Sequence, residues 1–155
     1  VGYVPQDIYL LGDTIIRNIA FGLNNDEIKS LKINSSVSIS NSSEFIDNLP
    51  KKLETLVGNR GLAISGGQRQ RIGIARSLYN SPNFLILDEA TNALDENTEK
   101  KIVKILIELS KKITVIFVTH NPSNLKHCTN VIKLDNDQIT NSLQNENEYE
   151  VLKKQ

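Results

Sequence analysis

One segment of the sequence organises the rest of the chain: it reads Ile64-Ser65-Gly66-Gly67-Gln68, then Phe84-Leu85-Ile86-Leu87-Asp88-Glu89, then Asn92-Ala93-Leu94-Asp95. A serine and two glycines precede a helix that the pattern predicts over residues 68–79. The apolar run that follows has the length and composition of a strand covered on both faces. It ends on two adjacent acids, which are costly to bury unless they are paired or bound to a metal. The segment therefore predicts an α/β fold with a polar site at the end of a buried strand.

Two explanations of residues 65–68 share one geometry. In the first, the segment is a capping box, in which the Ser65 side chain accepts the Gln68 N–H and the Gln68 side chain reaches back to Ser65. The two glycines then only let the chain turn into the helix. In the second, free N–H groups and the positive end of the helix dipole form an anion site. Glycines favour that site because they carry no side chain that would hold a phosphate away.

The sequence before this segment predicts a strand and a short helix. Residues 1–4 alternate in the manner of a strand, and Gln6 lies in the loop that follows. Residues 14–22 carry a short helical stripe, which Thr14 can cap and Gly22 can end. Residues 34–43 are rich in serine and asparagine, which favour caps and turns over helix interiors. We expect a weak helix or a loop there.

The sequence after the segment predicts a helix, a second buried strand and a hairpin. Asp95 can cap a helix that has apolar residues at positions 102, 103, 105, 106 and 109. The β-branched and aromatic run 113–118 predicts the strand. A histidine after a strand is usually structural, but a parallel strand here places His120 at the carboxyl-end crevice where ligands bind. Residues 131–134 and 138–140 form the predicted hairpin, around a turn at 135–137, and a polar tail follows it.

Composition limits the class of protein. The 155 residues are about one domain, and 18 basic against 18 acidic residues leave a net charge of zero. Such a chain has no global field that would draw it to nucleic acid, and no nucleic-acid partner is expected. A single cysteine, Cys128, excludes an internal disulfide framework. The chain lacks methionine and begins at Val1 inside a predicted strand, so we expect an excerpt from a longer polypeptide.

Several motifs, in order and spacing, resemble those of the ATP-binding cassette (ABC) ATPases. They are a Q-loop at Val4-Pro5-Gln6-Asp7, an X-loop at 54–61, a signature motif at 65–68, a Walker B strand at 84–89, a D-loop at 92–95 and a switch histidine at 120. Residues 14–22 resemble the exporter branch of the family. The chain departs from the family pattern at Asn59, where Glu is common, and at Asn92, where Ser is usual. It also lacks the alanine-rich helix that family members usually carry at 34–43.

The resemblance implies one group of residues that serve the nucleotide of their own subunit. Asp88 would hold Mg²⁺, usually through a water ligand, and Gln6 would reach the same Mg²⁺ and the attacking water. Glu89 would polarise that water as a general base. His120 would hydrogen-bond the γ-phosphate and Glu89. ATP and Mg²⁺ are the cofactors that this reading requires.

A second group would serve the nucleotide bound to the opposite subunit. The resemblance implies that Ser65, Gly66, Gly67 and Gln68 contact its γ-phosphate. Asp95 would help to align the two opposing sites, and this role is compatible with capping the helix that follows. The segment 64–95 is therefore expected to hold parts of two active sites, which are completed only in a dimer of nucleotide-binding domains.

The predicted fold is an α/β, P-loop NTPase fold of the ABC-ATPase type, incomplete at its N-terminus. We expect a helical, signature-bearing part at about 12–80, a catalytic core at 1–6 and 81–140 with a parallel sheet, and a polar tail at 141–155. No Gly-Lys pair of a Walker A loop occurs. The predicted function is ATP hydrolysis that drives export, as the C-terminal part of a nucleotide-binding domain at the cytoplasmic face of the cell (inner) membrane. The expected partners are a second nucleotide-binding domain and a transmembrane domain in the same polypeptide.

Two other functions stay open from the sequence. ABC ATPases of DNA repair or chromosome maintenance also join a signature motif to a Walker B strand and a histidine, although the neutral charge and the exporter-like loops disfavour them. The chain can also be a truncated, non-catalytic remnant. The sequence that precedes Val1 would decide between these readings.

Overall fold

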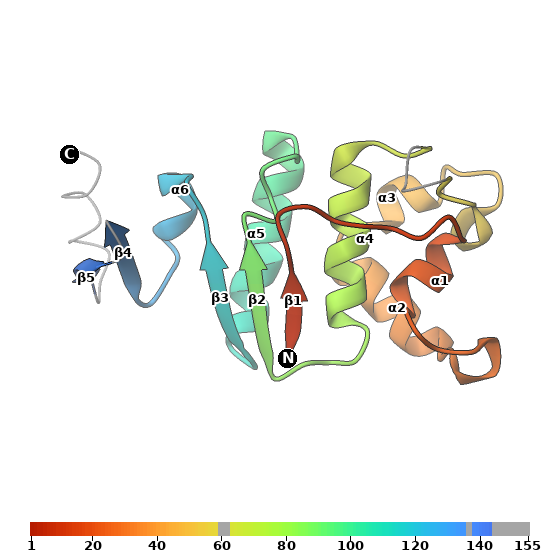
Figure 1. Cartoon of the computed structure of the whole chain (residues 1–155), viewed down its shortest axis with the longest axis horizontal. Coiled ribbons are helices and arrows are strands. Elements are labelled where there is room, and N and C mark those ends of the chain that lie inside the picture. The colour runs from red at the N-terminus through yellow and green to blue at the C-terminus, as the bar shows by residue number, and fades with distance from the viewer. Residues whose placement is uncertain (59–62, 136–137, 144–155) are drawn as a thin grey trace. The chain divides into compact units, whose positions relative to one another are not determined.

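The computed structural model of the chain describes residues 1–58, 63–135 and 138–143, and it divides into two compact units, Val1–Val118 and Thr119–Gln155. The first contains, in order, β1 (Gly2–Val4), α1 (Ile15–Ile19), the 3-10 helix η1 (Asn25–Glu27), α2 (Ser30–Ile39), α3 (Ser43–Ile46), the 3-10 helix η2 (Lys52–Glu54), α4 (Gly66–Leu78), β2 (Phe84–Asp88), α5 (Glu96–Ser110) and β3 (Thr114–Val118) (Figure 1). The second contains α6 (Pro122–Leu125), β4 (Val131–Asp135) and β5 (Gln138–Leu143).

The first unit holds a parallel sheet in the order β1-β2-β3, with Leu85 of β2 opposite Gly2 of β1 and Val115 of β3. The central position of β2 confirms the buried strand, because Leu85 and Leu87 are fully buried. Residues 114–118 form a strand as predicted, but the prediction that this strand is buried was wrong. Among the described residues β3 pairs with β2 alone, and Ile116 and Val118 of this edge strand are each 44% exposed.

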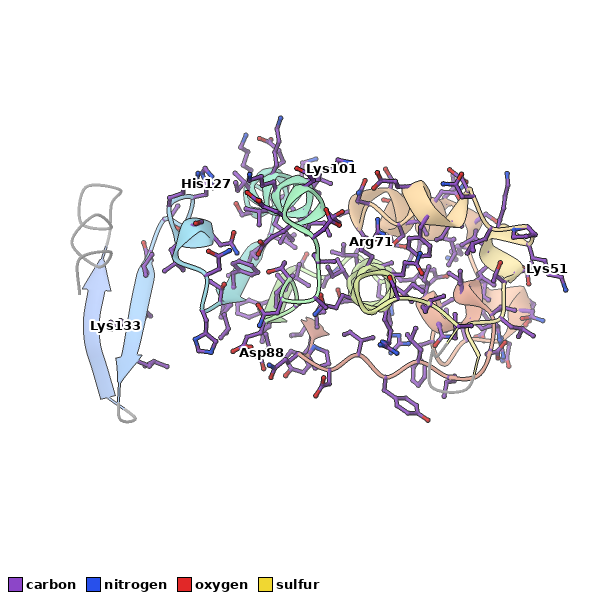
Figure 2. The ribbon with its side chains drawn as sticks, turned by 90° about the horizontal axis from the view of Figure 1, so that it is seen from above. Lys51, Arg71, Asp88, Lys101, His127 and Lys133 are labelled. Atoms are coloured by element: carbon purple, nitrogen blue, oxygen red, sulfur yellow. The ribbon has the colours of Figure 1, made fainter. Side chains whose placement is uncertain are left out.

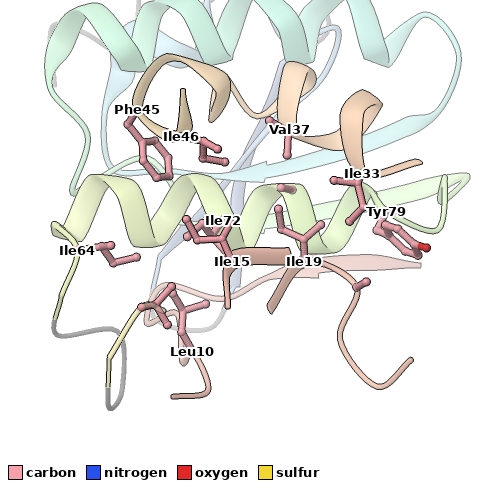
Figure 3. Packing of buried hydrophobic residues seen from close by; sticks show 13 residues of the cluster. Leu10, Ile15, Ile19, Ile33, Val37, Phe45, Ile46, Ile64, Ile72 and Tyr79 are labelled. Carbon is pink, nitrogen blue, oxygen red and sulfur yellow. The ribbon is translucent and has the colours of Figure 1, made fainter. Parts of the chain in front are cut away.

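Helix α4 lies between two hydrophobic clusters. Its residue Ile72 packs with Leu10, Ile15, Ile19 and Ile33 of the helical part (Figure 3). Its residues Ile74 and Leu78 instead pack with the sheet and with α5; this second cluster contains Val4, Leu85, Leu87, Ala90, Ile102 and Leu106. A single helix with two apolar faces therefore joins the helical part to the sheet, and it fixes the position of the turn at its N-terminus relative to both.

The segment expected to be a weak helix or a loop forms most of the regular helix α2. Of the two expected alternatives the helix is present over residues 34–39, because the serines there do not compete with it. Ser36 Oγ bonds the carbonyl oxygens of Lys32 at 2.8 Å and of Ile33 at 3.0 Å, both within its own helix. Ile33 and Val37 are buried in the helical cluster against α4. Tertiary packing of one face stabilises this helix more than its propensity does.

An ion cluster ties α3 to both α4 and α5. Glu44 accepts from Lys101 Nζ at 3.2 Å and pairs with Arg71 Nη1 at 3.5 Å; Arg71 and Lys101 are labelled in Figure 2. The Arg71 guanidinium also lies 4.8 Å from the centroid of the Phe45 ring. Burial lowers the pKa of Arg71, and the charge of Glu44 opposes that shift. Since the Glu44 side chain is half exposed, the cluster orients these helices more than it stabilises them.

Helix α1 begins as predicted and ends earlier. The Thr14 side chain accepts the Arg17 N–H, which confirms the cap. The C-cap is Ala20, whose N–H bonds to Ile16, so the helix ends before Gly22. Gly22 follows in a turn with a φ of 82°, which is a conformation that glycine adopts without strain.

The second unit contains the predicted hairpin. Strands β4 and β5 pair antiparallel, with an irregular register between Lys133 and Leu134. Strand β5 extends past Thr140 into the segment expected to be a polar tail. The turn at 136–137 and the rest of the tail, 144–155, lie outside the described residues. No helix in the described part of the chain has the length and hydrophobicity needed to cross a membrane.

Candidate active site

Glu89 is the first residue after β2, and its backbone is held in an unusual conformation. Its φ is 49°, in the left-handed region that non-glycine residues rarely adopt. Its N–H donates to the carbonyl of Val118 at 3.0 Å, which anchors the turn to the end of the neighbouring strand β3. Such strained positions persist only where the surroundings enforce them, and they cluster at functional sites.

The Glu89 carboxylate is oriented by two side-chain amides. Gln6 Nε2 and Asn92 Nδ2 each donate to Oε2 of Glu89, both at 2.8 Å. Gln6 follows β1 and Glu89 follows β2, and these parallel strands are neighbours, so their carboxyl ends meet at one edge of the sheet. The structure therefore brings together the Q-loop glutamine, the second acid of the Walker B motif and the first residue of the D-loop.

Asp88, which is labelled in Figure 2, is the last residue of β2. Its Oδ2 accepts a hydrogen bond from the hydroxyl of Tyr3 at 3.2 Å. This bond, followed by desolvation and by the charge of Asp88, raises the pKa of Tyr3. Sequence analysis missed Tyr3. The signal lay in the register: Tyr3 is opposite Ile86, and alternation puts Ile86 and Asp88 on one face of β2.

The turn at residues 65–68 forms the capping box. Ser65 Oγ accepts the Gln68 N–H at 3.2 Å, and Gln68 Oε1 accepts the Ser65 N–H at 3.0 Å. This geometry does not exclude an anion site. The N–H groups of Gly66 and Gly67, in the first turn of α4, have no partner within a helix. The Ser65 hydroxyl can accept the capping bond and still donate its own proton.

The D-loop packs directly on this turn. A Cβ atom at Gly67 would lie 3.1 Å from the Ala93 carbonyl oxygen, which is tighter than ordinary contact. A Cβ atom at Gly66 would meet Ala93 Cβ at 3.6 Å, which is an ordinary contact. A side chain at position 67 would therefore press on the D-loop backbone and displace it by a few tenths of an ångström, whereas the protein leaves room for a side chain at position 66.

Gln70 is a further residue that sequence analysis missed. It is 5% exposed, and its Oε1 accepts the Ala93 N–H at 3.1 Å. The signal was a polar side chain one turn before Ile74, on the face of α4 that the sheet buries. A polar hollow of about 220 Å³ opens beside it, and Gln6, Gly66 and Ala93 also line this hollow.

Asp95 is the N-cap of α5, as predicted, and its Oδ1 accepts the Thr98 N–H at 3.0 Å. Hydrogen bonds to the carboxylate, first from the Thr98 side chain and then from the Thr98 backbone N–H, lower the pKa of Asp95. Its role in aligning two sites stays a prediction. His120 lies in the second unit, two residues after β3, and its position relative to Glu89 is not described.

The X-loop begins beside α1. Ile15 N–H donates to Thr55, and Val57 N–H donates to Asp13, each at 3.0 Å. Residues 59–62, which include the expected departure at Asn59, lie outside the described residues.

The donor set at the strand end fits Mg²⁺. A carboxylate, Asp88, and an amide, Gln6, supply the hard oxygen ligands that this ion prefers. Within the described residues no group of three or more His, Cys, Asp or Glu side chains could hold a metal by itself. A small number of protein ligands is enough for Mg²⁺, because this ion keeps several water ligands and is usually also bound by substrate phosphates.

Comparison with known proteins identifies the family. The sequence model described as ABC transporter matches residues 1–92, which is more than half of the 155-residue chain. The chain belongs to the ABC transporter family. This finding confirms the resemblance inferred from the motifs, and with it the α/β, P-loop NTPase fold class.

Curated relatives are exporters or transporters. An ABC-type transporter, kk1G of Curvularia clavata, is 41% identical over 90% of this chain, which covers 11% of that protein. The ATP-dependent lipid A-core flippase of Photobacterium profundum is 38% identical over 90% of this chain, which covers 24% of the flippase. The mitochondrial ATP-binding cassette sub-family B member 10 of Mus musculus is 36% identical, with coverages of 90% and 20%.

A solved structure shares the fold. A bacterial Atm1-family ABC exporter with ATP bound matches 99% of this chain with a TM-score of 0.87 and 33% identity. This chain covers 26% of that exporter. The chain thus spans about a quarter or less of the length of each of these proteins. These matches support an exporter-type ATP-binding domain and do not favour the DNA-repair or remnant readings.

Proposed function

We propose that this chain is the signature-bearing and water-activating part of the nucleotide-binding domain of an ABC exporter. The observation that carries the proposal is the carboxylate of Glu89, held at the end of β2 by 2.8 Å hydrogen bonds from Gln6 and Asn92. Both bonds use the same oxygen, Oε2, and together they fix the orientation of the carboxylate. A carboxylate fixed in this way can accept a proton from a water molecule that attacks a phosphate.

The other residues of the strand end take supporting roles. Asp88 and Gln6 would hold Mg²⁺. A bound Mg²⁺ would neutralise the charge that develops on the phosphates. Tyr3, through its bond to Asp88, orients that carboxylate. His120 is proposed to hydrogen-bond the γ-phosphate, as the family resemblance implies. Together these side chains position a water molecule and stabilise charge, which is most of what phosphoryl transfer requires of a protein.

The signature turn is proposed to serve a second nucleotide, bound to a partner domain. The N–H groups of Gly66 and Gly67, the Ser65 hydroxyl and the Gln68 amide provide donors at a helix N-terminus, where the dipole favours an anion. The room at Gly66 supports this role, since no contact within the described residues requires glycine there. We therefore propose that two such domains sandwich two ATP molecules.

A transmembrane domain is the second proposed partner. An apolar hollow of about 230 Å³ opens beside the Q-loop, and Tyr9, Leu11 and Phe21 line it while staying 61%, 41% and 56% exposed. Exposed aromatic residues that gather at a hollow are typical of protein interfaces. Arg76 positions two residues that line the hollow. Its Nη1 donates to the Tyr9 carbonyl at 2.9 Å, and its guanidinium carbon lies 5.1 Å from the centroid of the Phe21 ring. Docking there would place the domain at the cytoplasmic face of the cell (inner) membrane.

The experiment that tests the proposal is Glu89→Gln in the full-length protein. The amide keeps the size of the side chain but cannot accept the proton, so we expect ATP binding to be retained and the hydrolysis rate to fall at least about 100-fold. Glu108→Gln is the matched control, since Glu108 is an exposed residue of α5 that pairs with Lys111. Hydrolysis by Glu89→Gln at the rate of the control would remove Glu89 from the reaction.

A further inference from the structure

Gln70 occupies a position that the proposed chemistry does not use. It lies one turn inside α4, is 5% exposed, and directs its Oε1 to the Ala93 N–H at 3.1 Å. A buried amide side chain costs free energy unless it is hydrogen-bonded. Its bond runs from the helix that carries the signature turn to the middle of the D-loop, and so it joins two functional segments that are 23 residues apart.

The contact around this bond is close and includes the D-loop backbone. At Gly67 a Cβ atom would lie 3.1 Å from the Ala93 carbonyl oxygen and 3.5 Å from Leu94 Cδ2. The backbone at Gly67 therefore packs directly against the Ala93 carbonyl of the D-loop. Helix α4 therefore contacts Ala93 on both sides: Gln70 accepts the Ala93 N–H, and Gly67 packs against the Ala93 carbonyl.

The D-loop is in turn attached to the carboxylate of Glu89. Asn92 donates from its backbone N–H to the Glu89 carbonyl at 3.2 Å and from its side chain to Glu89 Oε2 at 2.8 Å. Asn92 is the immediate neighbour of Ala93. A displacement of Ala93 therefore moves the amide that orients Glu89, and a continuous path runs from the first turn of α4 through Gln70 to that carboxylate.

We infer that Gln70 is a positioning residue that couples the signature turn to Glu89. The inference rests on the proposed function, in which these two segments face different nucleotides. A nucleotide held by the signature turn fixes α4, and the Gln70–Ala93 bond transmits that position to the D-loop and to the direction of Glu89. Each ATP then helps to orient the carboxylate that acts on the other.

The test uses the full-length protein and two substitutions of one residue. Gln70→Met has a similar length and no acceptor, whereas Gln70→Glu keeps an acceptor oxygen for the Ala93 N–H. Ile72→Val is the matched control for a weakened α4, since Ile72 is fully buried in the helical cluster and does not contact the D-loop through a side-chain hydrogen bond. ATPase rates give kcat and KM, and hydrogen exchange in peptides covering residues 90–95 reports the D-loop.

A misdirected base lowers kcat more than it changes substrate binding. We expect Gln70→Met to lower kcat about tenfold or more, with KM changed less than about twofold, and to speed exchange at 90–95. Gln70→Glu and Ile72→Val should keep kcat within about threefold of the parent protein. A parent-like kcat in Gln70→Met, or an equal loss in Gln70→Glu or in Ile72→Val, overturns the inference. Failure of the proposed function is distinct, because it would appear as unimpaired hydrolysis by Glu89→Gln.

Discussion

Gln6 donates a 2.8 Å hydrogen bond from its Nε2 to Oε2 of Glu89, although 83 residues separate the two in sequence. The bond exists because β1 and β2 are parallel neighbours and both residues lie just beyond the carboxyl ends of these strands (Figure 1). The loop after β1 also borders the apolar hollow at Tyr9 and Leu11. A movement of a partner docked at that hollow would therefore reach the Glu89 carboxylate through a short segment of chain.

Replacing Gln6 with Met should slow ATP hydrolysis by the full-length protein. The substitution removes one of the two amides that orient Glu89 and leaves the Asn92 bond in place. We expect kcat to fall about tenfold, less than the loss of a complete general base. Steady-state ATPase kinetics provide the measurement. Asn48→Leu is the control, since Asn48 is exposed and bonds the Glu44 carbonyl far from the strand end in sequence. Equal kcat values in the two variants would argue against an orienting role for Gln6.

The two signature glycines should respond differently to alanine. In Gly67→Ala the new Cβ would lie 3.1 Å from the Ala93 carbonyl oxygen, so the D-loop must shift even without nucleotide. Hydrogen exchange at residues 90–95 should then rise in the nucleotide-free protein. In Gly66→Ala the Cβ makes an ordinary contact, so exchange should stay unchanged while ATP-dependent activity falls. If Gly66→Ala is fully active, no phosphate approaches this position closely.

The hydrogen bonds of the buried side chain Asn18, inside the helical part, should contribute more to the free energy of unfolding than those of an exposed asparagine. Asn18 is fully buried, accepts the Leu11 N–H at 2.9 Å, and receives Arg76 Nη2 at 3.0 Å. Asn18→Leu removes the acceptor of these partly buried donors, and we expect the free energy of unfolding to fall by about 3 kcal/mol. Urea unfolding of the nucleotide-binding domain measures this free energy. The exposed control Asn48→Leu should change it by less than about 0.5 kcal/mol, and an equally small effect at Asn18 would refute the prediction.

The sequence predicted best those features that depend on local pattern. The capping box at Ser65 and Gln68, the cap at Asp95 and the central strand β2 each follow from residue type and spacing, and each is present. The sequence left open whether residues 34–43 form a weak helix or a loop; α2 is a regular helix because its serines bond within their own helix while its apolar face packs against α4. That packing depends on residues distant in sequence, and no local pattern contains it.

In the candidate site, too, the sequence predicted the residues that local motifs contain and not those that depend on tertiary contacts. Motif order indicated which residues belong to the site, and the structure brings Gln6, Glu89 and Asn92 together. The partners Tyr3 and Gln70 were not found, because each is defined by strand register or by a loop that packs on a helix face. The exposure of β3 was missed because the pattern of a strand does not reveal how many neighbours the strand has.

Helix α5 should lose stability at its first turn in acid. Hydrogen bonds from Thr98 lower the pKa of Asp95 in the folded protein, so its charge stabilises the fold above the unfolded pKa. This contribution is fully present at neutral pH and is lost as the pH falls below about 4, the ordinary value for aspartate, through the lower folded value. Asp95→Asn and Asp95→Ser keep a cap without a titrating charge. The difference in urea midpoint between the parent and these variants should therefore shrink from pH 6 to pH 3, whereas a constant difference would show that the charge of Asp95 does not contribute.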